Sequence, residues 1–268
     1  LITLLQDEDP HICSAALNTI HQIELTTIPT ISQLLQADQN KQSRIKAMQT
    51  LATLDWEAQS VFPIFNTLIT DKDWEIRLET VKILRKMASD KPDVFPLLVR
   101  ALQDENVWVR LVGIRGLGEM GEHAKDALPE ILRSLEKESG DTARLCEIIR
   151  IMAKIGMCQD TGAALIHKLQ HTSFEVRLEG LKALMTPGNI PLPPLLLFLE
   201  DKEWDIRLLA LESLAQLGYE LNPKTLKALR ELMKECPYES RYYFNHILEH
   251  FGLDVSTCLS ETLKAQDL

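Results

Sequence analysis

The sequence predicts an all-α fold in which about eight helical hairpins stack into a solenoid, which we expect to be a right-handed α-α superhelix. Three observations predict this architecture. An arginine returns every 30 to 34 residues, an acidic residue stands six positions before nearly every such arginine, and apolar residues between these marks recur at spacings of three and four. That spacing is the period of an amphipathic helix, and no alternating strand pattern competes with it.

The repeated arginine sets the register of the units. In chain order its positions are Arg44, Arg77, Arg110, Arg144, Arg177, Arg207 and Arg241. The pattern continues 31 residues before Arg44, where Cys13 takes the place of the arginine and Ala15-Ala16-Leu17 follows. This gives eight units, of which the first lacks most of its first helix and the last is divergent. We therefore assign residues 1–252 to the solenoid and residues 253–268 to a C-terminal cap or tail.

Short acidic turns separate the two helices of each unit. Six residues before the marker position stand Asp7, Asp38, Asp71, Asp104, Glu138, His171, Asp201 and Glu235, so that only His171 breaks the acidic column. Two residues further on, Asp73, Asn106 and their equivalents, including Gly140, Ser173 and Glu203, mark the start of the second helix. Most of these side chains can accept the free N–H groups of a helix start.

Prolines and glycines mark the outer ends of each unit. Prolines suited to the first turn of the first helix are Pro29, Pro63, Pro96, Pro129 and Pro193. Glycines suited to the end of the second helix are Gly121, Gly156, Gly188, Gly218 and Gly252. A representative unit then has helices over Val94–Gln103 and Val107–Met120. A single hairpin of this kind cannot bury its apolar face, so we expect stacked neighbours to share one elongated core.

Composition excludes several classes of protein. The chain has 268 residues, 45% of them hydrophobic and 25% charged, which is typical of a folded protein. Its longest apolar segment is far shorter than the roughly 20 residues that cross a bilayer, so no membrane span is expected. Five cysteines without a C-x-x-C spacing argue against a disulfide framework or zinc ribbon and favour a cytoplasmic location. A formal net charge of −10 makes nucleic acid an unlikely partner.

Two segments carry a family resemblance. Leu102-Gln103-Asp104 through Val109-Arg110 to Gly116-Leu117-Gly118, and Asp201 through Ile206-Arg207 to Leu214, resemble short HEAT repeats of the kind found in bilin lyase subunits. The resemblance extends from Leu1 to about Gly252. It implies that the aspartate and arginine of successive units form a ladder linking adjacent turns, here through Asp38, Arg44, Asp71, Arg77, Asp104, Arg110, Asp201 and Arg207. Cys13 and His171 would leave gaps in this ladder.

The resemblance also implies that the second helices line a concave face. Positions one, two and five after each arginine lie outside the strip that the core residues use. An apolar row there runs beside a partly basic row, and we predict a partner-binding surface at Leu78, Lys82, Leu111, Arg115, Leu145, Leu178, Lys182, Leu208, Tyr242, Tyr243 and His246. Alternatively, the leucines of this row fill the space between adjacent second helices. The aromatic residues at helix starts, Trp74, Trp108, Phe174, Trp204 and Tyr238, are interpreted as packing between turns.

One short motif is typical of an enzyme. His246-Ile247-Leu248-Glu249-His250 matches the H-x-x-E-H string of inverted zinc peptidases, in which two histidines bind zinc and the glutamate activates water. Such a site needs a third protein ligand, for which only Asp254, Glu261 and Asp267 are available downstream. We therefore rank a zinc hydrolase last among the candidate functions and expect no metal ion.

We predict a non-catalytic scaffold that binds a partner protein or peptide along its concave face, with no cofactor. Two alternatives stay open. The first is a lyase or chaperone subunit similar to bilin lyases, which would leave no short motif. The second is a DNA-binding HEAT-like protein, for which Lys46, Lys82, Arg115 and Lys182 supply only a thin basic strip. The sequence determines neither the identity of the partner nor the oligomeric state.

Overall fold

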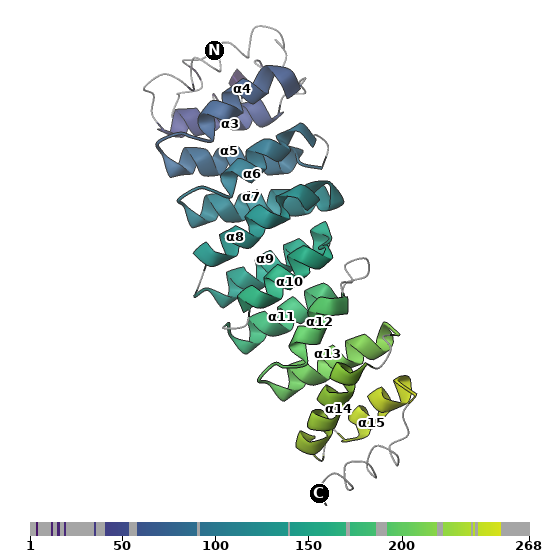
Figure 1. Ribbon diagram of the computed structural model, residues 1–268. Helices are drawn as coiled ribbons and strands as arrows, with labels where there is room; N and C mark the ends of the chain where they lie inside the picture. The colour runs from purple at the N-terminus through teal and green to yellow at the C-terminus, as the bar shows by residue number, and fades with distance from the viewer. Residues whose placement is uncertain are drawn as a thin grey trace, which may run out of the picture. The chain divides into compact units, whose positions relative to one another are not determined.

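The computed structural model is all-α, as the repeat pattern predicts, with helices paired into hairpins (Figure 1). It describes residues 41–53, 58–89, 92–138, 140–169, 172–185, 192–218, 222–236, 238 and 241–252, together with residues 4, 12, 15, 16, 19 and 35. Over this part of the chain no residue lies in a strand. None of the helices in this part is long and apolar enough to cross a membrane.

First and second helices alternate along the chain. The first helices are α4 (Ala58–Leu68), α6 (Phe95–Ala101), α8 (Leu128–Lys137), α10 (Gln159–Leu169), α12 (Leu192–Phe198) and α14 (Pro223–Glu235). The second helices are α3 (Lys41–Thr53), α5 (Trp74–Met87), α7 (Val107–Met120), α9 (Thr142–Ile155), α11 (Phe174–Leu184), α13 (Trp204–Gln216) and α15 (Arg241–His250). Short 3-10 helices, η2 (Pro92–Val94) and η3 (Gly121–Ala127), precede α6 and α8.

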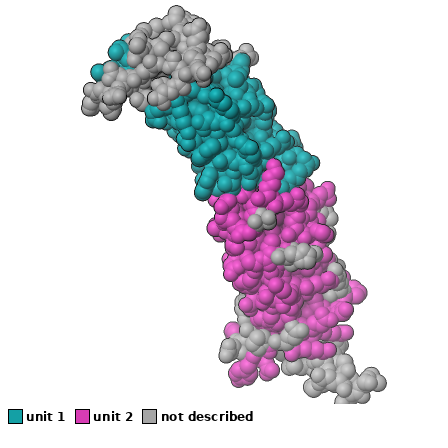
Figure 2. Space-filling view, turned by 90° about the vertical axis from the view of Figure 1, so that its left-hand side faces the viewer, with its two compact units in different colours: residues 1–134 teal, residues 135–268 magenta. Residues whose placement is uncertain are grey.

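The chain divides into two compact units, residues 1–134 and residues 135–268 (Figure 2). In the first unit α5 packs between α3 and α7, and α6 packs against α7. In the second unit α11 packs against both α9 and α13, while α10 packs against α12. Each unit is therefore a stack in which second helices lie next to second helices, the arrangement of an α-solenoid.

The buried stripe of α5 shows how the sequence period produces this packing. Ile76, Val81 and Leu84 are completely buried, whereas Met87 near the end of the helix is half-buried. These residues lie on one side of the helix because their spacing follows its period of 3.6 residues. The same register in α7 and α11 buries Val109 and Val176. The core thus runs through the middle of each stack and leaves one side of each second helix to solvent.

Helix starts follow the predicted capping positions, with some differences. Asp73 Oδ1 accepts a hydrogen bond from the backbone N–H of Glu75 at 2.9 Å, and Asn106 Oδ1 accepts one from Trp108 at the same distance. Ser173 and Glu203 precede their helices without a side-chain cap bond. In the fifth unit Asp141, not Gly140, caps α9, since Gly140 has φ +109° and carries no side-chain acceptor.

Two other predicted boundaries were wrong. Pro63 lies inside α4 and not in its first turn, because the helix begins five residues earlier at Ala58. The predicted helix Val94–Gln103 is shorter, since Pro92–Val94 forms a 3-10 turn and the α-helix ends at Ala101. By contrast, the predicted bounds Val107–Met120 are those observed, and Gly121 with φ +57° ends this helix. Pro29, Gly188, Cys13 and His171 lie outside the described residues.

Candidate functional site

The repeated arginines connect successive turns. Arg77 donates from Nε to Asp104 Oδ2 at 2.7 Å and from Nη2 to Asp104 Oδ1 at 2.9 Å, so it spans from its own unit to the next. Its third nitrogen, Nη1, donates to the backbone carbonyl of Asp71 in its own turn at 2.8 Å. The carboxylate of Asp104 also accepts from the backbone N–H of Asn106 at 2.8 Å. One buried guanidinium therefore fixes two turns at once, as a planar bidentate group can.

The same arrangement recurs in both compact units, residues 1–134 and residues 135–268. Arg177 donates to both carboxylate oxygens of Asp201, at 2.7 and 3.0 Å, and to the carbonyl of Thr172 at 2.7 Å. Arg44 bonds to Asp71 and to the carbonyl of Leu35. For the remaining ladder residues, Arg110 and Arg207 donate to the carbonyls of Asp104 and Asp201 in their own turns. Asp38 lies outside the described residues.

The ladder departs from this arrangement at Arg144, whose counterpart in the next turn is His171 in the sequence. Arg144 forms ion pairs with Glu138 at 3.3 Å and Asp141 at 2.8 Å, both in its own turn. Its side chain is 31% exposed, against 8% for Arg77 and 2% for Arg177. Arg44, Arg77 and Arg177 thus use guanidinium donors between turns, which indicates a structural role for these side chains.

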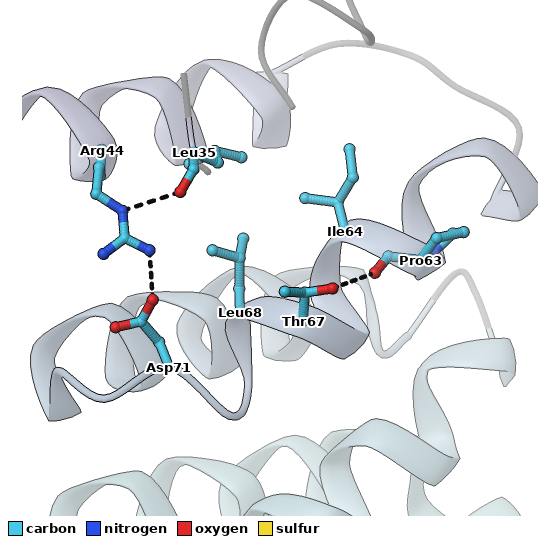
Figure 3. A pocket seen from close by; sticks show the side chains of 7 residues that line it. All are labelled: Leu35, Arg44, Pro63, Ile64, Thr67, Leu68 and Asp71. Atoms are coloured by element: carbon cyan, nitrogen blue, oxygen red, sulfur yellow. Dashed lines mark hydrogen bonds and ion pairs between the residues drawn. The ribbon is translucent and has the colours of Figure 1, made fainter. Parts of the chain in front are cut away.

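A hollow of about 470 Å³ opens between α3 and α4 (Figure 3). Its walls are Leu35, Arg44, Pro63, Ile64, Thr67, Leu68 and Asp71. The two charged groups in it, Arg44 and Asp71, bond to each other, and Thr67 donates to the carbonyl of Pro63 at 3.1 Å. The hollow thus exposes a ladder pair and an apolar wall, and none of its described lining residues is a nucleophile with an adjacent base.

The second-helix face is the side of the second helices that points away from the completely buried stripe of Ile76, Val81 and Leu84 and its equivalents, and the predicted binding residues lie on it. Three of the predicted leucines, Leu111, Leu145 and Leu208, are buried. Leu78, Leu178 and Arg115 are half-buried, whereas Lys82, Lys182, Tyr242 and His246 are exposed. Tyr243 lies in α15, but its side chain is outside the described part of the structure. In the described residues the row is therefore not a continuous exposed apolar patch: its exposed members are basic or aromatic, and Leu78 and Leu178 are only partly exposed.

Polar pairs join successive second helices across this face. Gln49 of α3 donates to Glu79 of α5 at 3.1 Å. Arg85 of α5 pairs with Glu119 of α7 at 2.6 Å. In the second unit Arg150 of α9 donates to both carboxylate oxygens of Glu179 in α11, at 2.7 and 3.1 Å. These bonds hold neighbouring helices in register and fix the positions of the charged side chains that a partner would meet.

Trp108 is a surface residue that the sequence interpretation assigned to packing. It is 51% exposed at the start of α7, and Trp74 is 40% exposed at the start of α5. Trp108 and Arg115 are seven residues apart, close to two helical turns, so they lie on the same side of α7. That seven-residue spacing was the available signal, but Trp108 was grouped with the aromatics that stand three residues before four of the arginines, Trp74, Phe174, Trp204 and Tyr238, although it is shifted by one position.

Helix α15 carries the histidines and the glutamate of the H-x-x-E-H string, residues 246–250, on its exposed side. The rings of His246 and His250 stack with centroids 4.8 Å apart, and both residues and Glu249 are exposed. Over the residues that the structure describes, no group of three or more His, Cys, Asp or Glu side chains could hold a metal ion. The motif therefore contributes two neighbouring imidazoles on the outside of α15. Tyr242, one turn earlier, is 86% exposed.

A stack of helical hairpins with a buried arginine–aspartate ladder defines a helical-repeat protein. Residues 63–147 and 162–242 match the family model described as HEAT repeats, and the chain belongs to this family. A search of curated proteins finds no match.

Several solved structures are similar to this chain at low sequence identity. An engineered protein is 17% identical with a TM-score of 0.49, and the match covers 99% of this chain and 80% of that one. The complex of CpcE and CpcF of phycocyanin lyase from Nostoc is 19% identical with a TM-score of 0.41, covering 88% and 93%. A structure from work on the interaction between cadherin and beta-catenin is 13% identical with a TM-score of 0.51, covering 99% and 63%. At these identities the similarity shows the fold alone.

Proposed function

We propose that this protein is a non-catalytic scaffold that binds a partner protein or peptide on its second-helix face. One observation carries the proposal: side-chain pairs between neighbouring second helices, such as Arg85 with Glu119 and Arg150 with Glu179, pre-organise charged groups on an open face. Binding to a pre-organised surface loses less conformational entropy, so the gain in affinity is larger. HEAT repeats supply such a surface over many helices.

Because Leu111, Leu145 and Leu208 are buried, fewer of the predicted residues can contact a partner. These leucines pack beneath the exposed side chains of the face. We assign the contacts with the partner to Lys82, Arg115, Lys182, Tyr242 and His246, with Tyr243 as a neighbour in α15. Exposed tyrosines and cations are residue types that supply much of the binding energy at protein interfaces. No arrangement of the described side chains favours the lyase, DNA-binding or hydrolase alternatives over this function.

Affinity capture with the full-length protein, followed by binding measurements on each purified candidate, tests the proposal. A variant with Lys182→Glu and Tyr242→Asp should lose binding at least tenfold, which corresponds to about 1.4 kcal/mol. A matched variant with Lys227→Glu and Leu197→Asp makes the same kinds of change on exposed positions of the first helices α14 and α12. If both variants lose the same affinity while their circular dichroism is unchanged, the second-helix face is not the binding surface.

A further inference from the structure

Helices α5 and α7 of the first unit present a basic part of the second-helix face. On α5 the side chains of Leu78, Lys82, Arg85 and Lys86 are half-buried or exposed, and the completely buried residues lie on the opposite side of the helix. On α7, Arg115 and Trp108 lie on the corresponding side. The two helices pack against each other, so these residues form one continuous surface, which we call the α5–α7 patch.

In the pairs Lys82–Glu79 and Arg85–Glu119 of the α5–α7 patch, the cation is more exposed than its carboxylate. Lys82 is 49% exposed and its partner Glu79 is 18% exposed, at 3.2 Å. Arg85 is 38% exposed and its partner Glu119 is 29% exposed. At the start of α5, Glu75 is held by Lys41 of α3. A molecule that approaches the patch therefore meets positive charge first, although each pair is neutral as a whole.

The charge of the patch is opposite to that of the unit that carries it. Residues 1–134 contain 14 lysines and arginines against 19 aspartates and glutamates. On this side of α5 and α7 the cations of Lys82, Arg85, Lys86 and Arg115 outnumber the carboxylates of Glu75, Glu79 and Glu119, of which Glu75 pairs with Lys41 of α3. A local excess of one sign on a surface of the other sign steers oppositely charged partners and selects among them.

Trp108 adds an apolar anchor to this charge pattern. Seven residues separate it from Arg115, which is about 10 Å along the helix axis, so a single partner helix can reach both. A half-exposed tryptophan two helical turns from a cation on the same side of α7 is complementary to a segment with carboxylates and large apolar side chains. A nucleic acid would use the cations but would gain nothing from the carboxylates between them, and four cations make few phosphate contacts.

We propose that the α5–α7 patch docks an acidic amphipathic segment of the partner protein, with an apolar side chain on Trp108 and carboxylates on Lys82, Lys86 and Arg115. This inference rests on the proposed scaffold function and names the chemistry of its partner. Cation-rich and anion-rich surfaces that meet in this way associate rapidly, and their affinity falls as the salt concentration rises.

A fluorescent peptide of about 15 residues, with Leu and Phe on one side of the helix and Glu on the other, is a direct probe. The full chain should bind it, and should bind a counterpart with Lys in place of Glu at least tenfold more weakly. Raising the salt concentration should weaken the first interaction. Lys82→Glu, Lys86→Glu and Arg115→Glu together should abolish binding, and Trp108→Ala should reduce it at least fivefold.

Matched controls make the outcome decisive. Arg100→Glu, Lys125→Glu and Arg133→Glu change the net charge equally at exposed positions outside the patch, and should leave binding unchanged. If the triple variant alters the circular dichroism spectrum, the milder double variant with Lys82→Gln and Lys86→Gln replaces it in the binding measurement. Equal affinity for the two peptides, equal loss in the control variant, or displacement of the peptide by duplex DNA would overturn the proposal. If a captured partner instead binds through Lys182 and Tyr242 alone, the inference fails while the scaffold function stands.

Discussion

At the scale of single residues, Arg177 is the clearest test of the ladder. Its side chain is 2% exposed and bonds to both oxygens of Asp201. Arg177→Ala would leave the buried carboxylate without its counter-ion, and we expect a loss of about 3 to 5 kcal/mol in the free energy of unfolding. Arg150→Ala is the control, since Arg150 is 64% exposed in its pair with Glu179 and should cost about 0.2 to 1 kcal/mol. Urea unfolding followed by circular dichroism measures both, and similar small losses would refute a structural ladder.

Asp71 makes the ladder sensitive to acid. Burial by itself would raise the pKa of Asp71, but the Arg44 guanidinium and the backbone N–H of Asp73 outweigh it, so the pKa lies below its usual value. A lowered pKa in the folded state means that the ionised carboxylate stabilises the fold above the unfolded-state pKa. This contribution is lost as the pH falls through the folded-state pKa.

The Asp71→Asn variant should therefore lose less free energy of unfolding than the unmodified protein when the pH falls from about 5 to 2. Asp126→Asn, at an exposed position in η3, should leave the slope unchanged. Thermal unfolding midpoints over this pH range give the comparison. Parallel curves for the Asp71 variant and the unmodified protein would show that the pair with Arg44 has no net effect.

At the scale of helices, the contact between α6 and α7 depends on two glycines. A Cβ at Gly113 would lie 2.9 Å from Ala101 Cβ and 3.2 Å from the carbonyl oxygen of Leu98, both fixed to the backbone. A Cβ at Gly116 would meet the side-chain ends of Leu98 at 2.9 and 3.1 Å, and it would be in ordinary van der Waals contact with the Cα of Arg85 at 3.5 Å. We expect Gly113→Ala to destabilise by about 1 to 3 kcal/mol through overpacking. Gly116→Ala should cost less, because Leu98 can move and alanine favours the helix by about 1 kcal/mol. Denaturation midpoints of the two variants test this order, and a more damaging Gly116→Ala would contradict it.

Helix positions could be predicted from the sequence because the same marks recur in every unit. The acidic turn, the cap at Asp73 or Asn106 and the glycine at Gly121 act within a few residues of the chain, and they gave α7 its exact bounds. Pro63 was misplaced because a proline is compatible with several positions near a helix start, and only packing selects among them. The N-cap of α9 is Asp141, one residue after the predicted position, for a different reason: Gly140 supplies no side-chain acceptor and its neighbour does.

Exposure on the second-helix face could be predicted less well. Helical periodicity places Leu78 and Leu111 in one column, yet Leu78 is half-buried and Leu111 is buried. The difference depends on how closely neighbouring helices approach, which a single sequence does not encode position by position. The sequence did indicate a partly basic row there, but the outward placement of Lys82 over Glu79 follows from side-chain length and the neighbouring helix, so the greater exposure of the cations in these pairs emerged only from the structure.

At the scale of the whole molecule, local packing predicts stepwise unfolding. The extensive contacts of the described helices join elements that are neighbours or next neighbours along the chain, and they divide the chain into residues 1–134 and 135–268. Proteins built in this way have stabilities that add up from repeats and their nearest neighbours, so cooperativity across the whole chain is limited. Tryptophans distinguish the units, since Trp56, Trp74 and Trp108 belong to the first and Trp204 to the second.

We expect a Trp204→Phe variant and a variant that keeps only Trp204 to report different urea midpoints by fluorescence, because each reports one unit. Circular dichroism should then give a broader transition than either reporter, since it averages over all helices. The circular dichroism midpoint of each variant, compared with that of the unmodified protein, controls for destabilisation by the substitutions themselves. Coincident midpoints in all three measurements would mean that the ladder and the shared core couple the units into one cooperative fold, and the nearest-neighbour description would then fail for this protein.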